Sequence, residues 1–188
     1  AFIAEPIMGT GGVLLPPDVV GIPIDHDVVG TIEQALRWHP GARRLVVVVD
    51  SSPWGREWEQ QLRAPTAEFA GRLAFEFLVG LPTDELQQRL RDLPADTIVF
   101  SPGFFVDGRG RTFVPREAVR LVAAASAAPV YGPFATFVGT GIVGGRTTGY
   151  DAIGHRGAEI VLALLAGAAP GTLALPPVMP KALHVDWR

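Results

Sequence analysis

One stretch decides the fold class: Leu45-Val46-Val47-Val48-Val49-Asp50-Ser51-Ser52-Pro53-Trp54-Gly55. Its first five residues are consecutive apolar β-formers, typical of a strand buried on both faces of a parallel sheet. The next six residues are polar, aromatic or small, and they predict a loop. We expect a helix over residues 56–70 after this loop. The stretch therefore indicates the start of a strand–helix–strand unit.

Short runs of β-branched residues alternate with helical stretches from about Val19 onward. We predict strands at residues 19–24, 45–49, 73–79, 97–101, 129–131 and 142–144, and a final extended piece at 182–187. We predict further helices from residue 28 to a stop at 40–41, from 82 or 83 to 93, from 115 to 126, and from 150 or 151 to 165, ending at 167. This order predicts an α/β fold with a doubly wound, mostly parallel sheet and helices on both faces, in the flavodoxin-like arrangement.

The first helix is preceded by Asp25-His26-Asp27. Aspartate is a favoured N-cap, because its carboxylate accepts hydrogen bonds from the free N–H groups of the first turn. The same three residues could bind a metal ion, but sequence neighbours point in different directions at a helix start. We therefore expect a cap and a solvated histidine here, and no metal site.

The composition fits one packed domain and excludes several classes of protein. Of 188 residues, 48% are hydrophobic and 19% charged, which supplies a core and argues against disorder. Sixteen Lys and Arg against nineteen Asp and Glu give a net charge of -3, which disfavours nucleic-acid binding. The chain has no cysteine, so disulfides, thiolate zinc sites and cysteine nucleophiles are excluded.

We expect neither a membrane span nor a secretory signal in this sequence. The longest apolar stretch near the C-terminus, residues 160–169, is about half of the ~20 residues that a bilayer crossing needs. The first residues, 1–5, lack the basic start and long apolar core of a signal peptide.

Candidate ligand-binding residues follow the carboxyl ends of the predicted strands, where open doubly wound sheets bind ligands. Ser51 and Ser52 precede a helix N-terminus, which favours an anion such as a carboxylate. The other candidates are mainly aromatic, and little fixed charge accompanies them. The full set is Ser51, Ser52, Trp54, Ser101, Phe104, Phe105, Tyr131 and Phe134. It predicts recognition of a small, partly apolar ligand. The alternative is that the serines are helix caps and that Trp54 and Phe104 are core or lid residues.

We interpret two motifs that could suggest catalysis as turns. Gly139-Thr140-Gly141-Ile142-Val143-Gly144 fits G-x-G-x-x-G, but it runs into a strand-like stretch rather than opening a helix. We predict a glycine-rich turn there. The Asp107-Gly108-Arg109-Gly110-Arg111 loop lacks the acid spacing of a calcium site, and we expect a surface turn. No nucleophile elbow and no phosphate-binding loop occurs, so we assign no catalytic residue, no metal site and no cofactor.

Residues from about 18 to 188 resemble the second lobe of the type 1 periplasmic-binding fold. More narrowly, they resemble the extracytoplasmic sensor region of bacterial sensor histidine kinases, which are related to substrate-binding proteins of ABC transporters. The resemblance lies in the order of several segments, among them Val20-Gly21-Ile22-Pro23-Ile24-Asp25, Ala42-Arg43-Arg44-Leu45-Val46-Val47-Val48, Leu93-Pro94-Ala95-Asp96-Thr97-Ile98-Val99, Ala128-Pro129-Val130-Tyr131-Gly132 and Val185-Asp186-Trp187-Arg188. It implies two lobes joined by hinge strands, a ligand that closes the cleft, and a signal passed to a kinase module. The first lobe is missing here, so we expect only half of a cleft and no kinase chemistry.

Residues 1–17 break the α/β pattern and resemble a segment of class III pyridoxal-phosphate aminotransferases. The segment is Ala1-Phe2-Ile3-Ala4-Glu5-Pro6-Ile7-Met8-Gly9-Thr10-Gly11-Gly12-Val13-Leu14-Leu15-Pro16-Pro17. The acidic strand end that should follow is absent, and the single lysine, Lys181, is outside the Schiff-base context of that family. We therefore divide the chain into an atypical segment, 1–17, foreign or a remnant, and a ligand-binding-type lobe, 18–188.

Together these observations predict a non-catalytic, extracytoplasmic sensing domain of a membrane signalling protein such as a sensor histidine kinase. The expected partner is a small molecule, an amino acid or small aromatic acid, and the membrane is reached only through the parent protein. An exposed cleft face would favour a homodimer. The alternatives are the solute-binding component of an ABC transporter, an aminotransferase fragment, and a flavodoxin-like nucleotide binder.

Overall fold

A computed structural model describes residues 20–22, 24–173 and 179–186. The chain divides into two compact units. The sheet unit comprises His26–Thr147 and Ala182–Arg188, and the α5 unit comprises Ala1–Asp25 and Thr148–Lys181. The chain therefore passes from one unit to the other three times. The boundary that we expect after residue 17 lies outside the described residues.

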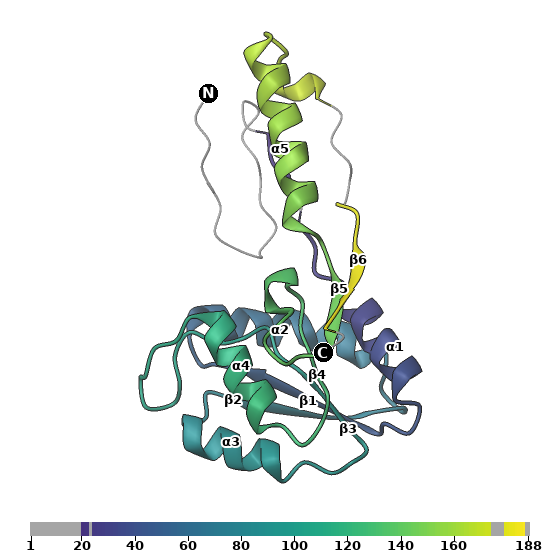
Figure 1. The fold of residues 1–188 in the computed structure, drawn as a ribbon, viewed down its shortest axis with the longest axis vertical. Helices are drawn as coiled ribbons and strands as arrows, with labels where there is room; N and C mark the ends of the chain where they lie inside the picture. The colour runs from purple at the N-terminus through teal and green to yellow at the C-terminus, as the bar shows by residue number, and fades with distance from the viewer. Residues whose placement is uncertain (1–19, 23, 174–178, 187–188) are drawn as a thin grey trace. The chain divides into compact units, whose positions relative to one another are not determined.

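All six strands of the described chain belong to one sheet in the sheet unit (Figure 1). Their order is β2-β1-β3-β4-β5-β6, and every neighbouring pair is parallel except β5 and β6. The strands are β1 Arg44–Val49, β2 Ala74–Val79, β3 Thr97–Phe100, β4 Val130–Tyr131, β5 Gly144–Thr147 and β6 Ala182–Val185. The strand order reverses between β1 and β3, as in the flavodoxin-like arrangement. The predicted fold class is confirmed.

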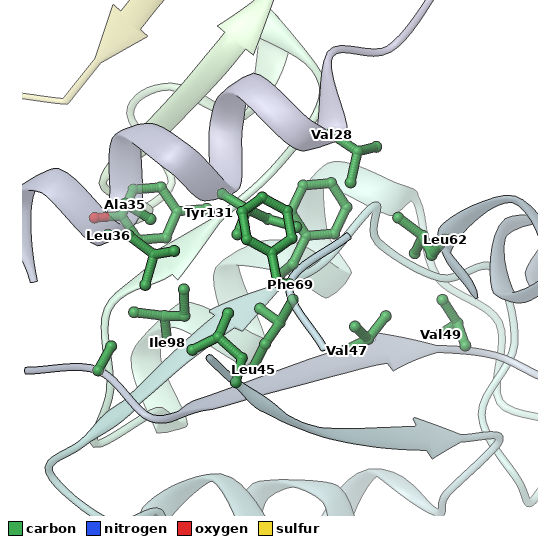
Figure 2. Packing of buried hydrophobic residues seen from close by; sticks show 14 of the residues in the cluster. Val28, Ala35, Leu36, Leu45, Val47, Val49, Leu62, Phe69, Ile98 and Tyr131 are labelled. Atoms are coloured by element: carbon green, nitrogen blue, oxygen red, sulfur yellow. The ribbon is translucent and has the colours of Figure 1, made fainter. Parts of the chain in front are cut away.

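Four helices of the sheet unit cover both faces of the sheet (Figure 1). They are α1 Val28–Trp38, α2 Pro53–Ala67, α3 Thr83–Arg91 and α4 Pro115–Ala125, and a 3-10 turn, η1, spans Ala135–Phe137. Alternate residues of β1 point to opposite faces. Leu45, Val47 and Val49 pack with α1 and α2 in one core cluster, shown in Figure 2. Val46 and Val48 pack with α3 and α4 in the other cluster.

The start of α1 follows the expected capping chemistry. The carboxylate of Asp27 accepts a hydrogen bond from the Gly30 N–H at 2.9 Å. One oxygen of the same carboxylate lies 2.8 Å from Nε of Arg146 on β5. Asp27 therefore caps the helix and ties it to the sheet, as expected for a capping rather than a metal-binding residue.

Among the starts of the observed elements, those of α2 and β5 differ most from the predicted ones. Helix α2 begins at Pro53 rather than at residue 56, because proline lacks an N–H and suits the first helical position. Strand β5 begins at Gly144 rather than at residue 142. The backbone of β6 passes so close to this position that a Cβ on Gly144 would lie 2.0 Å from the His184 carbonyl oxygen. The strand therefore starts where a residue without a side chain allows the two backbones to approach.

The strand predicted at residues 19–24 is wrong for the part that the structure describes. Residues 20–22 and Ile24 belong to no strand, and Ile24 is 51% exposed. A β-rich stretch forms a strand only where a neighbour completes its hydrogen bonds, and none of the described strands pairs with this one.

The described part of the α5 unit contains helix α5, Tyr150–Leu165, and a 3-10 turn, η2, at Pro170–Thr172. The helix ends as predicted, with Gly167 in the left-handed conformation at a φ of 93°. None of the described helices combines the length and the apolar character that crossing a membrane requires.

The double-sided burial of β1 predicts a large difference between two Val→Ala substitutions in the sheet unit. Val47 is fully buried in the central strand, whereas Val114, just before α4, is 59% exposed. Val47→Ala should lower the free energy of unfolding by about 2–3 kcal/mol, the transfer and cavity cost of the two methyl groups removed. Val114→Ala should change it by less than about 0.5 kcal/mol. Urea denaturation followed by circular dichroism measures both, and equal effects would contradict the proposed core.

Candidate functional site

The carboxyl ends of β1 and β3 define the place where the strand order reverses. These strands are parallel neighbours, with Val47 opposite Phe100, so the residues that follow them lie at one edge of the sheet. Asp50 follows β1 and Ser101 follows β3, and both are buried. Ligands of open α/β sheets bind in the crevice outside this edge.

Asp50 joins the two loops that leave this edge. It is 2% exposed, and its carboxylate accepts four hydrogen bonds. The oxygen Oδ1 accepts from the N–H and the hydroxyl of Ser52. The oxygen Oδ2 accepts from the backbone N–H groups of Phe105, at 2.7 Å, and Val106, at 3.2 Å. One carboxylate thus connects the start of α2 with the loop between β3 and α4.

The two predicted serines differ in their surroundings. Ser52 caps α2, because its hydroxyl oxygen accepts a hydrogen bond from the Gly55 N–H at 3.1 Å while the hydroxyl proton goes to Asp50. This is the helix-cap alternative for Ser52. Ser51 is exposed, and its carbonyl oxygen accepts a hydrogen bond from the Arg56 guanidinium. Ser51 therefore remains the accessible serine beside the helix N-terminus.

Five rings from four separate segments form what we call the aromatic cluster. Trp54 and Trp58 lie on α2, Phe105 follows β3, Phe134 follows β4, and His26 precedes α1. The Trp54 ring meets Phe105 edge to face, with centroids 4.8 Å apart, and Trp58 lies 6.1 Å from Trp54. Phe134 lies 5.9 Å from Trp58, and His26 lies about 5 Å from both, at 5.0 Å and 4.9 Å. The cluster extends along the carboxyl edge of the sheet.

Sequence reasoning placed Trp54, Phe105 and Phe134 together but missed two members of the cluster. Trp58 was detectable, because a residue four positions after Trp54 shares its face of the helix. His26 was interpreted as a solvated residue near a cap, and its contacts come from rings that are distant in sequence. Phe105 is the more open end of the cluster, 43% exposed, whereas Trp58 is buried at 3%.

Three predicted site residues are buried inside the sheet unit. Ser101 is fully buried, and its hydroxyl oxygen accepts a hydrogen bond from the Gly103 N–H at 3.1 Å. Phe104 packs in the core against α3 and α4, edge to face with Phe113. These side chains support the edge of the sheet from inside, as the core alternative for Phe104 describes.

Tyr131, the third of them, is part of the core cluster that Figure 2 shows around α1. Its ring is 2% exposed, and its hydroxyl lies 2.9 Å from Nε2 of His39 at the end of α1. Burial raises the pKa of Tyr131 to about 12. The phenol therefore stays neutral and holds α1 to β4, away from the exposed edge.

The same loop between β3 and α4 contains a second buried carboxylate, Asp107. It accepts hydrogen bonds from the hydroxyl and the N–H of Thr83 and from the N–H groups of Arg109 and Arg111. The hydroxyl of Thr83 contributes most, and together these bonds lower the pKa of Asp107 from 3.8 to about 2. The loop is thus a turn built on an aspartate, as expected, although the aspartate itself is buried.

The remaining motifs form a turn and an ion pair. The glycine-rich stretch forms a turn before β5, with Gly139 and Gly141 at positive φ, as predicted. Lys181 forms an ion pair with Asp25 within the α5 unit. The part of the chain that the structure describes holds no group of three or more His, Asp or Glu side chains able to bind a metal.

Comparisons with known proteins place the fold. The chain matches no protein-family model and no curated protein in sequence. Among solved structures it is similar to a ligand-free, open substrate-binding protein with adhesive properties from Clostridium difficile, with a TM-score of 0.67 and 14% identity over 88% of this chain and 55% of that one. The fold is therefore like that of about half of this substrate-binding protein.

Two further structures share this fold. A conserved domain protein from Vibrio cholerae O1 biovar El Tor has a TM-score of 0.64 and 19% identity, covering 88% of this chain and 54% of its own. The ABC domain in complex with L-Trp from Streptococcus pneumonia has a TM-score of 0.61 and 13% identity, covering 86% and 53%. The chain spans about half the length of each structure.

The tight contact between Asp50 and α2 predicts that position 55 tolerates only glycine. A Cβ on Gly55 would lie 2.0 Å from Oδ1 of Asp50 and 2.2 Å from its carbonyl oxygen. Gly55→Ala should therefore lower the free energy of unfolding by about 1–3 kcal/mol through overpacking. Gly41→Ala is the control, because nothing lies within 4 Å of its added Cβ. Thermal unfolding compares the two, and a Gly55 variant as stable as wild type would contradict the contact.

The lowered pKa of Asp107 predicts a stability loss in acid. The unfolded chain binds this proton near pH 3.8 and the folded chain only near pH 2, so the contribution of Asp107 is present above pH 3.8 and disappears as the pH falls towards 2. Asp107→Asn should therefore be less stable than wild type at pH 6, and the gap should narrow as the pH approaches 2. Urea denaturation across this pH range tests the effect, and a gap independent of pH would contradict it.

Proposed function

We propose that this chain is the larger part of a non-catalytic, extracytoplasmic small-molecule-binding domain, and that its aromatic cluster forms one wall of the ligand site. The observation that carries the proposal is the gathering of rings from four distant segments at the carboxyl edge where the strand order reverses. Open α/β sheets bind their ligands at this place. The fold shared with substrate-binding proteins supports the same role.

The chemistry of the edge favours an amino acid or small acid with an aromatic group. The exposed ring of Phe105 and the half-buried ring of Trp54 suit a planar apolar group, because aromatic pairs add about 0.5–1.5 kcal/mol beyond their buried area. Ser51 and the N-terminal end of α2 favour a carboxylate. One structure with this fold is a complex with L-Trp, which carries both groups.

Ligand binding would shift a population between open and closed forms of the complete protein. The structures with this fold are about twice as long as this chain, so the opposite wall of the site would come from the rest of the parent protein. A ligand favours closure only by the difference between its affinities for the two forms. With one wall, this chain should bind weakly, with a dissociation constant on the order of 1 mM or above.

The parent protein is proposed to be either a membrane sensor such as a sensor histidine kinase or the solute-binding component of an ABC transporter. The sensor interpretation is supported by the order of sequence segments along the chain. The transporter interpretation is supported by the substrate-binding-protein fold. Both give this chain the same task, which is to recognise a small molecule outside the cytoplasm.

Titration with L-Trp, followed by saturation-transfer NMR, tests the proposed wall. The wild-type chain should give a signal on the indole protons of the ligand, and Trp54→Ala should weaken binding at least about threefold, since it removes an aromatic contact. Trp38→Ala is the matched control. Trp38, the last residue of α1, is 41% exposed and stacks on Tyr131. It lies outside the aromatic cluster, so its removal should not change the affinity for L-Trp.

Three results would count against the proposal. The first is the absence of any ligand signal with the wild-type chain, and the second is equal weakening by the two tryptophan variants. A tight one-to-one complex of the isolated chain would contradict the half-cleft argument instead.

A further inference from the structure

We propose that Asp50 is the positioning residue of the aromatic cluster: its carboxylate holds the backbone of Phe105 so that the Phe105 ring stands edge to face against Trp54. The inference deepens the proposed function and rests on it for its effect on ligand affinity. Its structural part concerns the unliganded chain alone. It therefore can be tested whether or not L-Trp binds.

The carboxylate divides its two oxygens between the two segments that carry these rings. Through Oδ1 it binds Ser52, the cap of the helix that carries Trp54 two residues later. Through Oδ2 it binds the N–H of Phe105 itself, at 2.7 Å, and that of the next residue. The spacing between the helix start and the loop is thus set by one rigid group, and the two rings meet at a centroid distance of 4.8 Å.

Packing alone does not fix the Phe105 ring. It is 43% exposed, and among the rings of the cluster it touches Trp54. The loop beyond it closes on itself, because the carbonyl oxygen of Phe105 accepts a hydrogen bond from the Phe113 N–H at 2.8 Å, and Val106 forms a bridge with Thr112. The far part of the loop is tied to the start of α3 through Asp107, whereas Phe105 itself is tied to the start of α2 through Asp50, so the ring position depends on the Asp50 bonds.

The chemistry of the position requires an aspartate. Four donors point at the side chain, and an ionised carboxylate is the short group that only accepts, with two oxygens. Each carboxylate oxygen accepts from one pair of donors. In an asparagine an NH2 group would replace one oxygen and would point its two N–H donors at one of these pairs. A glutamate would need room that the contact with Gly55 denies, since even a Cβ there would lie 2.0 Å from Oδ1.

Asp107 offers a matched control within the same unit. It is 7% exposed, accepts four hydrogen bonds, and ties a later turn of the same loop to the start of α3. Removing either carboxylate leaves a similar number of buried donors without an acceptor, so both changes should destabilise the fold to a similar extent. The two differ in that the bonds of Asp50 go to Phe105, a member of the aromatic cluster.

The structural readout is the Trp54 indole N–H resonance in ¹⁵N-labelled, ligand-free protein, assigned with Trp54→Phe. Phe105→Ala removes the ring current of the neighbouring phenyl group and defines the displaced position. Asp50→Ala should move the Trp54 resonance towards that position, whereas Asp107→Ala should leave it unchanged. Asp50→Asn keeps the size of the side chain and should give an intermediate shift, which preserves the test if the alanine variant does not fold.

The functional readout is the affinity for L-Trp. Asp50→Ala should weaken it about three- to tenfold, the equivalent of one ordered side chain, and Asp107→Ala should leave it unchanged. An unmoved Trp54 resonance in both Asp50 variants would overturn the inference, as would equal shifts in the Asp50 and Asp107 variants. If the resonance moves as expected but wild type itself does not bind L-Trp, the positioning role is supported and the proposed function fails.

Discussion

The burial of β1 on both of its faces is the constraint on which the rest of the sheet unit depends. Val46, Val47 and Val48 are each 1% exposed or less, although neighbouring residues point to opposite sides. Such a strand is stable only if apolar layers cover both faces, which requires helices above and below the sheet. A parallel neighbour then needs a crossover connection, and the crossovers that lead from β1 through β2 and β3 to β4 contain α2, α3 and α4. The order β2-β1-β3-β4-β5 follows this rule on both sides of β1.

The same constraint places the candidate site. Because the buried strands are parallel, their carboxyl ends meet at one edge, and the chain must change direction there. Asp50 sits where the first of these turns begins, and its oxygens satisfy N–H groups that the turn would otherwise leave buried and unpaired. Structural need and the proposed function coincide at this residue. The hydrogen bonds that complete the turn also bring Phe105 to Trp54.

The features that the sequence predicted are those set by local pattern. The apolar run before Asp50, the cap at Asp27 and the stop at Gly167 were readable because each depends on residues a few positions apart. The site was predicted in part. Tyr131 was predicted to face the ligand because it ends a strand. That strand, β4, is only two residues long, and the Tyr131 ring points into the core instead. Only the register of β4 with β3 reveals this orientation. The pairing of Trp58 with Phe134 joins segments far apart in the chain, and no local pattern encodes it.

The proposed function makes the carboxyl edge of this sheet a ligand-binding surface. The most direct measurement is a map of backbone amide shifts in ¹⁵N-labelled protein during titration with L-Trp. We expect the largest shift changes at Trp54, Phe105 and Phe134, and almost none at the buried residues of α3 and α4. Changes confined to α3 and α4, or none at millimolar ligand, would contradict this expectation.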